Sequence, residues 1–331
     1  MFKKAQKHCG LILMYHHINT LESDEWQLAV SAKNFAEQLS VLSDFNVVSI
    51  NEMADAVRAK SVRPNSIAIS FDDGYEDNYS NAASLLANYR YPASFFLTNS
   101  IGNEQPQYWW DELERILLLS KHIPEILELN VRSVRYRWNL SGNWTEIISP
   151  ASLSELAGWL RWKVPPSTRH ALFVYISEWM KSLTYEEQQS VIEQLKLQCN
   201  DKGERSDAFK CISSANLDSL RQISQFEIGG HTATHIALTN FSNAIKSQSI
   251  HSNKVFLESI LYQPVTGFAY PHGSYDKDSI DILQQMGFRY GCTTQEAVVT
   301  TEADPYKLPR FHAKDWNGRQ FHQHIEEWMG K

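Results

Sequence analysis

The sequence predicts an α/β fold in which parallel β-strands alternate with helices that cover them. Short apolar runs rich in β-branched residues alternate with segments whose apolar residues recur at helical spacing. Several of these runs end in polar side chains, at the strand ends where chemistry gathers in parallel α/β folds. The alternation breaks at residues 103–212. This segment is therefore predicted as an insertion, with residues 1–102 and 213–331 forming one domain around it.

The N-terminal part of the predicted domain contains four strands and three helices. Phe35, Leu39 and Leu42 recur at helical spacing behind Ser31, which is a favourable N-cap residue. The strands are predicted at residues 10–15, 47–50, 66–71 and 92–98, and the helices at residues 32–44, 51–60 and 80–91.

The C-terminal part repeats the same rhythm after the insertion. Helices are predicted at residues 217–224, 242–261 and 276–288, and strands at residues 226–229, 265–270, 290–294 and 308–316. No internal repeat or low-complexity linker interrupts them.

The insertion is predicted to be mainly helical, with one hairpin. A helix begins near Tyr108, and two strands within residues 131–147 flank Ser141 and Gly142. Three further helices are predicted at residues 152–164, 167–183 and 185–198. The last should bury the apolar residues Val191, Ile192, Leu195 and Leu197. Its tryptophans could stack on sugar rings, although packing within a small subdomain is favoured.

Composition narrows the class of protein. The 331 residues carry a net charge of -7, which argues against a nucleic-acid-binding protein because such a protein needs a basic face. The four cysteines are widely spaced without a CxxC pair, so they are expected to be reduced, packed thiols. No signal-peptide core or membrane-spanning stretch is visible, which predicts a cytoplasmic location. A chain from which a leader had been removed would look the same.

Two adjacent carboxylates end the apolar run 66–71. Asp72 and Asp73 precede Gly74, and like charges at the end of a buried strand repel each other and lose hydration. A divalent cation could take one carboxylate and leave the other as a base. A solvated turn built on Gly74 explains the same residues equally well.

A histidine pair favours the metal interpretation. His231 and His235 follow the predicted strand 226–229 at i and i+4, a spacing that puts both imidazoles on one face of a helical turn. One aspartate and two histidines would form a three-ligand site. Such a site leaves a coordination position for water, as catalytic zinc sites do.

These segments resemble the motifs of a known family. SFDDG at 70–74, HTATH at 231–235 and FAYPHG at 268–273 resemble, in order, the first three motifs of the polysaccharide deacetylases, the NodB-homology group or carbohydrate esterase family 4. The resemblance spans roughly residues 10–100 and 215–315. It implies a distorted (β/α), TIM-like barrel with its chemistry at the C-terminal ends of the strands.

The resemblance also implies a metal site and a general base. Asp73, His231 and His235 would be metal ligands, and Asp72 would deprotonate the attacking water. The ion would be zinc first, with cobalt, manganese or nickel as alternatives. The backbone N–H of His272, after Pro271, would stabilise the oxyanion. Ala269 stands where many members carry an arginine that orients the catalytic aspartate, so that arginine is expected to be absent.

The general acid is left between two histidines. A strand ending in YH near the N-terminus resembles the branch of the family whose motifs are circularly permuted, which makes His16 the first choice. His312, at the end of the last predicted strand, is the alternative. The His272 side chain, Tyr75 and Trp316 are further candidates for lining the substrate site.

By this resemblance, the chain is expected to remove acetyl groups from N-acetylated amino sugars of a bacterial surface polysaccharide or its precursor. Its partner would be an acetylated sugar or polysaccharide, with no nucleic acid and no membrane span. O-acetyl ester hydrolysis, another metal-dependent amide hydrolysis, and non-catalytic carbohydrate binding are the alternatives. The oligomeric state is left open.

Overall fold

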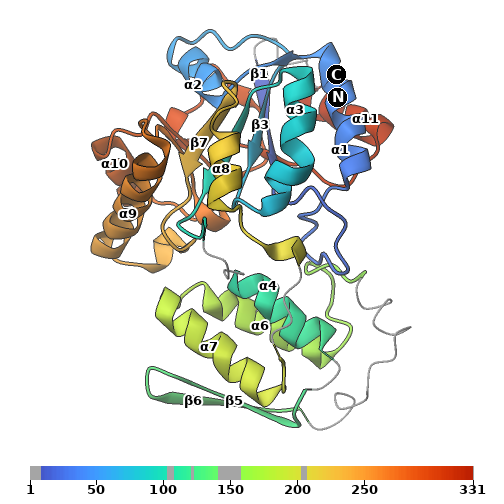
Figure 1. Cartoon of the computed structure of the whole chain (residues 1–331), viewed down its shortest axis with the longest axis vertical. Helices are drawn as coiled ribbons and strands as arrows, with labels where there is room; N and C mark the ends of the chain where they lie inside the picture. The colour runs from blue at the N-terminus through green and yellow to red at the C-terminus, as the bar shows by residue number, and fades with distance from the viewer. Residues whose placement is uncertain (1–8, 103–107, 121–122, 141–157, 203–206, 331) are drawn as a thin grey trace. The chain divides into compact units, whose positions relative to one another are not determined.

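The computed structural model describes residues 9–102, 108–120, 123–140, 158–202 and 207–330. These residues divide into two compact units. The first is drawn from residues 1–20, 28–104 and 211–331, and the second from residues 21–27 and 105–210. Each is described separately below (Figure 1).

A nine-stranded sheet forms the centre of the first unit, in the order β10-β1-β3-β4-β7-β8-β9, with β11 paired to β1 and β2 paired to β3. Its strands are β1 (Cys9–Tyr15), β2 (Asn46–Val47), β3 (Ser66–Phe71), β4 (Ala93–Leu97), β7 (Phe226–Gly230), β8 (Gly267–Ala269), β9 (Tyr290–Cys292), β10 (Val299–Thr300) and β11 (Phe311–His312). Every strand pair is parallel except β1 with β10. The predicted α/β class with parallel strands is therefore confirmed.

The sheet curls back on itself. Leu308 bridges to Cys292 in β9, and Phe311 pairs with Leu13 in β1, so one short segment contacts the last strand of the order and the strand next to its other end. This closure gives the barrel-like form that the family resemblance implies.

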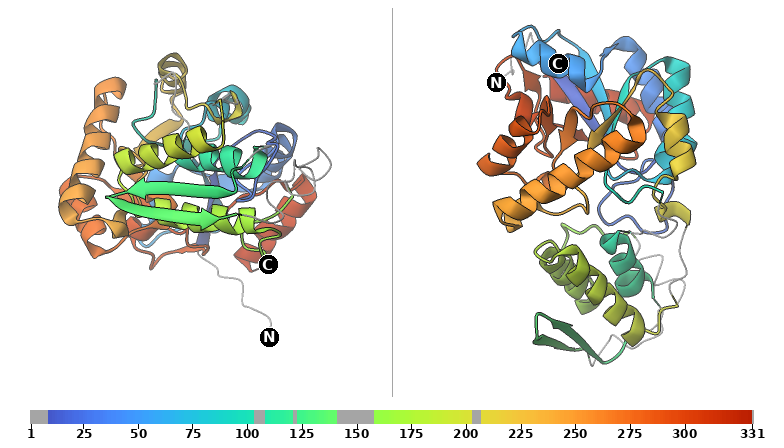
Figure 2. Two further views of the ribbon diagram at one scale, coloured as in Figure 1. Left: turned by 90° about the horizontal axis from the view of Figure 1, so that it is seen from below. Right: turned by 60° about the vertical axis from the view of Figure 1, so that its left-hand side comes forward.

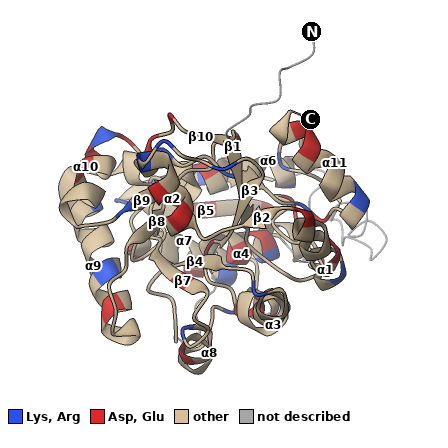
Figure 3. Ribbon diagram, turned by 90° about the horizontal axis from the view of Figure 1, so that it is seen from above, with Lys and Arg blue, Asp and Glu red and all other residues tan. Residues whose placement is uncertain are grey.

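Helices surround this sheet, as Figures 1 and 3 show. They are α1 (Ala32–Val41), α2 (Ile50–Arg58), α3 (Ser84–Tyr89), α8 (Ser214–Leu220), α9 (Asn243–Leu261), α10 (Lys277–Gln285) and α11 (Gly318–Met329). A π-helical segment, Asn78–Ala83, leads into α3. Short 3₁₀ turns lie at Leu42–Asp44, Leu238–Asn240, Pro271–Gly273 and Pro305–Lys307. Basic and acidic residues are interspersed along the helices (Figure 3).

Side-chain caps fix where several helices begin. Ser31 accepts a hydrogen bond from the backbone of Asn34, as its cap position predicts. Ser49 and Glu52 form a capping box, so α2 begins at Ile50. The strand predicted at 47–50 is therefore wrong beyond Val47. Strand β10 and helix α11 were not predicted from the sequence.

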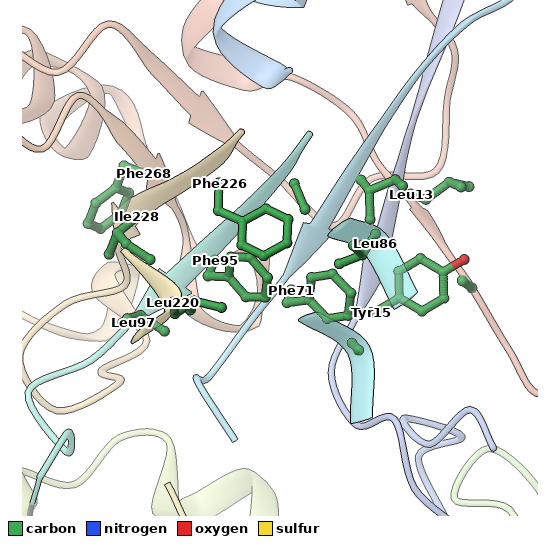
Figure 4. Close-up of a cluster of buried hydrophobic side chains, with 14 of the residues drawn as sticks. Leu13, Tyr15, Phe71, Leu86, Phe95, Leu97, Leu220, Phe226, Ile228 and Phe268 are labelled. Atoms are coloured by element: carbon green, nitrogen blue, oxygen red, sulfur yellow. The ribbon is translucent and has the colours of Figure 1, made fainter. Parts of the chain in front are cut away.

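The core lies between the sheet and its helices. The rings of Phe71 and Phe95 stack with their centroids 4.9 Å apart, and the Tyr15 ring packs on Phe71 at 5.4 Å (Figure 4). These strands alternate: Leu11, Leu13 and Tyr15 face the helices, and Ile12 faces a second cluster inside the barrel. In β3, Ala68 and Ser70 likewise face the barrel interior. Asp72, two residues after Ser70, faces the same side.

The second unit contains α4 (Trp109–Glu114), a π-helical segment (Arg115–Leu119), the strands β5 (Ile126–Val131) and β6 (Val134–Asn139), α6 (Thr168–Met180), α7 (Tyr185–Gln198) and a 3₁₀ turn (Asp207–Phe209). The two strands form an antiparallel hairpin, drawn side by side in Figure 2. Helices α6 and α7 match the predicted segments 167–183 and 185–198.

Three sequence predictions for this unit are wrong. The hairpin turns at Arg132 and Ser133, both at positive φ, because the alternating pattern begins before residue 131; Ser141 and Gly142 lie outside the described residues. Residues 158–164, the described part of the helix predicted at 152–164, form turns. Leu197 is 81% exposed, because it lies one residue off the buried face of α7.

Two expectations from composition have structural counterparts. All four cysteines lie in the described residues as buried thiols, and no disulfide joins them. Among the helices that the structure describes, none is both long and apolar enough to cross a membrane.

Candidate active site

Asp73, His231 and His235 converge at the C-terminal ends of β3 and β7. Nε2 of His231 lies 3.3 Å and Nε2 of His235 lies 3.2 Å from Oδ1 of Asp73. All three residues are buried, and their ligand atoms lie within 4.8 Å of one another. Parallel strands bring these residues together although 158 positions separate Asp73 from His231, because β3 and β7 both pair with β4.

The backbone turns sharply at these residues. Asp73 and His235 have φ values of 70° and 54°, and Thr232 has 61°. Non-glycine residues in this region cost free energy and cluster at functional sites. Residues 231–235 form this tight turn and not a helical turn. The predicted helical placement of the two histidines is therefore wrong, but the turn still directs both rings toward Asp73.

The His231 ring is held by its other nitrogen. Nδ1 lies 2.8 Å from the carbonyl oxygen of Ala269, which can only accept, so Nδ1 carries a proton and Nε2 is the nitrogen that faces Asp73. The His231 backbone N–H donates to the Asn253 side chain at 2.9 Å. Metal-binding histidines in proteins are oriented in this way.

The three side chains fit a divalent ion. One carboxylate and two imidazoles are the donor set that binds zinc and related ions while leaving positions for water. Although burial opposes it, the neighbouring His235 and His231 hold the pKa of Asp73 well below its usual range. The carboxylate is thus ionised and available as a ligand.

Asp72 is held by a buried arginine. Nη1 and Nη2 of Arg310 each donate to one carboxylate oxygen of Asp72 at 2.7 Å, and Arg310 is completely buried. Burial favours the neutral acid, but the Arg310 charge and hydrogen bonds outweigh it and lower the pKa of Asp72. Arg310 also donates to the Thr293 carbonyl and to the Ser70 hydroxyl.

The expectation that no arginine orients Asp72 is therefore wrong. Ala269 cannot fill this role, but Arg310 reaches Asp72 from the segment that closes the barrel. A signal existed in the sequence: Arg310 lies two residues before His312 in a predicted strand, so both residues should face the same side of the sheet. A charged residue facing a barrel interior needs a partner.

The two candidate acids lie beside each other. His16 follows β1 and His312 ends β11, and their ring centroids are 5.5 Å apart. Both are half-buried, and burial lowers the pKa of each, that of His312 to about 3. For His16, the charges of Asp73 and Asp72 oppose this shift.

The remaining candidates divide into two groups. His272 is exposed and has a φ of 56°, and its ring centroid lies 4.4 Å from that of His235, a candidate metal ligand. Pro271 before it is buried. Tyr75 is completely buried with its ring 3.6 Å from that of His17. Trp316 packs on His324 of α11 at 4.0 Å. Tyr75 is therefore a packing residue, whereas Trp316 is only partly buried and stays a predicted residue of the substrate site.

Taken together, these features define a class of β/α-barrel proteins with a candidate metal centre at the strand ends and a tethered carboxylate beside it. The chain contains a polysaccharide deacetylase domain: the model of that family matches residues 59–119 and 206–291. The match includes Asp72, Asp73, His231 and His235. It does not include His16, Arg310 or His312.

Two proteins that are similar to this chain in sequence are named as N-deacetylases. The chain is 28% identical over 127 residues to a poly-β-1,6-N-acetyl-D-glucosamine N-deacetylase of Staphylococcus epidermidis, which covers 36% of this chain and 43% of that protein. A Staphylococcus aureus protein of the same name is 23% identical over 112 residues, covering 32% and 38%. The chain thus matches less than half the length of these relatives.

Solved structures share the fold over nearly the whole chain. Streptococcus pyogenes deacetylase PplD has a TM-score of 0.56 at 16% identity, covering 97% of this chain and 98% of that one. IcaB from Ammonifex degensii has a TM-score of 0.58 at 14% identity, covering 98% and 99%. At these identities, the likeness concerns the fold.

Proposed function

We propose that this chain is a metal-dependent N-deacetylase that removes acetyl groups from amino sugars of a bacterial surface polysaccharide or its precursor. The observation that carries the proposal is the convergence of Asp73, His231 and His235 next to the tethered Asp72. The match to the family model and the names of the sequence relatives support the same substrate class.

Asp73, His231 and His235 would hold the divalent ion. Zinc suits this donor set best, and cobalt, manganese or nickel could replace it. When bound, the ion supplies Lewis-acid polarisation of the acetyl carbonyl and a lowered pKa of water.

Asp72 would act as the general base. Because Arg310 lowers its pKa, Asp72 is a carboxylate near neutral pH and can accept the proton of the attacking water. The two parallel hydrogen bonds from Arg310 fix the carboxylate plane, so the proton acceptor is already oriented when substrate binds.

His16 would protonate the leaving amine, with His312 as the alternative. An amide nitrogen leaves as an amine only after it gains a proton, so amide hydrolysis depends on an acid. The charges of Asp72 and Asp73 act to raise the pKa of His16, whereas His312 lacks the larger of these influences and has a pKa of about 3. This difference favours His16.

The segment Pro271–Gly273 would serve the oxyanion. A backbone N–H fixed in a tight turn needs no reorganisation as charge develops on the acetyl oxygen. The His272 N–H would be this donor, and the exposed ring beside His235 would contact the sugar. We also propose residues 103–212 as an inserted domain that selects the substrate; Tyr175 and Trp162 there are more than half exposed and could stack on sugars.

The first test is metal content. We expect the purified protein to bind about one equivalent of zinc by elemental analysis, and Asp73→Ala and His231→Ala to lose it. His322→Ala, on the surface of α11, is the matched control and should retain the ion. Acetate release from N-acetylglucosamine oligomers should follow the same order. A wild-type protein that binds no ion after addition of zinc or cobalt would contradict the proposal.

A further inference from the structure

We propose that Asn78, supported by Asp77 and His17, positions His16 as the general acid through the His16 backbone. This inference rests on the proposed deacetylase function and extends it to residues beyond Asp72, His16 and the candidate metal ligands.

In the part of the chain that the structure describes, the side chain of His16 lacks a polar partner at one of its ring nitrogens. Within the described residues, its Nδ1 is buried and makes no hydrogen bond. A catalytic histidine is usually oriented by a carboxylate or carbonyl that binds its second ring nitrogen. Because His16 has no such partner at Nδ1, the place of its ring depends on the backbone that carries it and on packing beside His312.

That backbone is anchored by the segment following β3. Strands β1 and β3 are parallel neighbours, and the N–H of Asp72 donates to the carbonyl of Tyr15 at 3.0 Å. The segments that follow the two strands therefore start side by side. Nδ2 of Asn78 then donates to the His16 carbonyl at 2.6 Å. Asn78 is 1% exposed, and water therefore cannot replace this bond.

Asp77 fixes the next residues of the same segment. Its Oδ1 accepts hydrogen bonds from the Ile18 backbone at 3.1 Å and from Asn78 Nδ2 at 2.9 Å. Its Oδ2 lies 2.9 Å from Nδ1 of His17, which therefore carries the proton. The His17 ring is pressed against Tyr75, with the two ring centroids 3.6 Å apart.

The consequence is a direct link between acid and base. The segment that carries Asp72 and Asp73 also carries Asp77 and Asn78, which hold the backbone of His16. The base, one metal ligand and the acid are thereby set in one geometry, and a small displacement of catalytic groups is costly to rate.

The chain offers a matched control. Nδ2 of Asn81 donates to the Ile18 carbonyl at 2.7 Å, which is the same kind of bond two residues further from the acid. Asn78→Ala should affect catalysis by His16, whereas Asn81→Ala removes an equivalent bond without moving it.

The experiment compares amide and activated-ester substrates with the zinc-loaded protein. For an N-acetylglucosamine oligomer, we expect Asn78→Ala to lower kcat by about 10- to 100-fold with little change in KM. The loss is smaller than the full rate contribution of a general acid, because His16 is still present but misplaced. Hydrolysis of 4-nitrophenyl acetate should change less than about threefold, because that leaving group needs no proton. Asn81→Ala should stay within about threefold on both substrates, and zinc content should be unchanged in all variants.

A double-mutant cycle completes the test. In a His16→Ala background, Asn78→Ala should have almost no further effect on amide hydrolysis, because residues that act as one unit are not additive. If Asn78→Ala does not fold, Asn78→Leu keeps nearly the same side-chain volume, removes the donor without adding a charge and carries the same comparison. Equal losses on amide and ester, additive losses in the cycle, or an equal effect of Asn81→Ala would overturn the positioning role. A zinc-loaded wild type without deacetylase activity would instead overturn the proposed function, and this role with it.

Discussion

At the scale of single residues, the ion pair between Arg310 and Asp72 is the most constrained feature of the site. Both residues are buried, and both oxygens of the carboxylate are used by the guanidinium. Such a pair contributes little net free energy compared with apolar residues, but removing one partner leaves an uncompensated buried charge.

This predicts a large loss of stability from one substitution. Arg310→Met should lower the free energy of unfolding by about 3–5 kcal/mol, because Asp72 stays buried without its partner. Urea unfolding followed by circular dichroism measures the effect. The control is Arg137→Ala, which breaks a pair with Glu128 on a side chain that is 61% exposed and should cost at most about 1 kcal/mol. Equal losses in the two variants would contradict this account.

At the scale of secondary-structure elements, strand β7 shows how close packing constrains the backbone that leads to His231. Gly229 lies between β4 and β8, and a Cβ atom there would lie 2.5 Å from the Phe96 ring and 2.9 Å from the Gly267 carbonyl oxygen. The Gly-Gly sequence before the first histidine is therefore a packing requirement of the barrel interior.

Gly229→Ala should consequently destabilise the protein. We expect a loss of about 1–3 kcal/mol from overpacking, and weaker zinc binding as β7 shifts. Gly318→Ala is the control, because a Cβ atom there meets nothing closer than 3.4 Å and Gly318 begins helix α11. It should be neutral or stabilise by up to about 1 kcal/mol. Thermal unfolding of both variants tests this; a Gly229→Ala protein as stable as the wild type would refute the packing argument.

At the scale of the whole molecule, the segment 21–27 leaves the barrel unit soon after His16 and belongs to the second unit. There Glu25 and Glu114 form a pair of buried carboxyl groups. Burial raises the pKa of Glu25 to about 7, and burial together with the Glu25 charge raises the pKa of Glu114 well above its usual value. Asp24, Asp111, Ser23 and Arg161 also face the pair.

This pair predicts that stability falls as pH rises. Between the ordinary glutamate pKa near 4.5 and about 7, the folded chain holds protons that the unfolded chain has lost. The free energy of unfolding therefore decreases through this range, by up to about 1.4 kcal/mol per pH unit for each proton. Glu25→Gln should flatten the dependence, measured as urea midpoints at pH 5, 6, 7 and 8. Glu302→Gln, at an exposed glutamate, should keep the wild-type slope. If Glu25→Gln keeps the wild-type slope, the pair of Glu25 and Glu114 is not the origin of the pH dependence.

Sequence reasoning was most successful where the information is local. Strands β1, β3, β4 and β7 and helices α6, α7 and α9 have their own periodic patterns, and the acidic strand end and the histidine pair are visible as short motifs. The identities of the three residues in the candidate metal centre follow from these motifs alone. The conformation of the histidine turn does not, because i and i+4 spacing is compatible with a helix and with a tight turn at positive φ.

The sequence by itself determined the class of fold, most strands of the barrel and the chemical groups available at the strand ends. Only the tertiary structure decided which groups meet. Arg310 reaches Asp72 across 238 positions because the last segment closes the barrel beside β1, and His16 meets His312 for the same reason. Glu25 meets Glu114 only within the folded second unit. Spacing along the chain encodes local geometry, but contacts between distant residues depend on which strands and helices pack side by side.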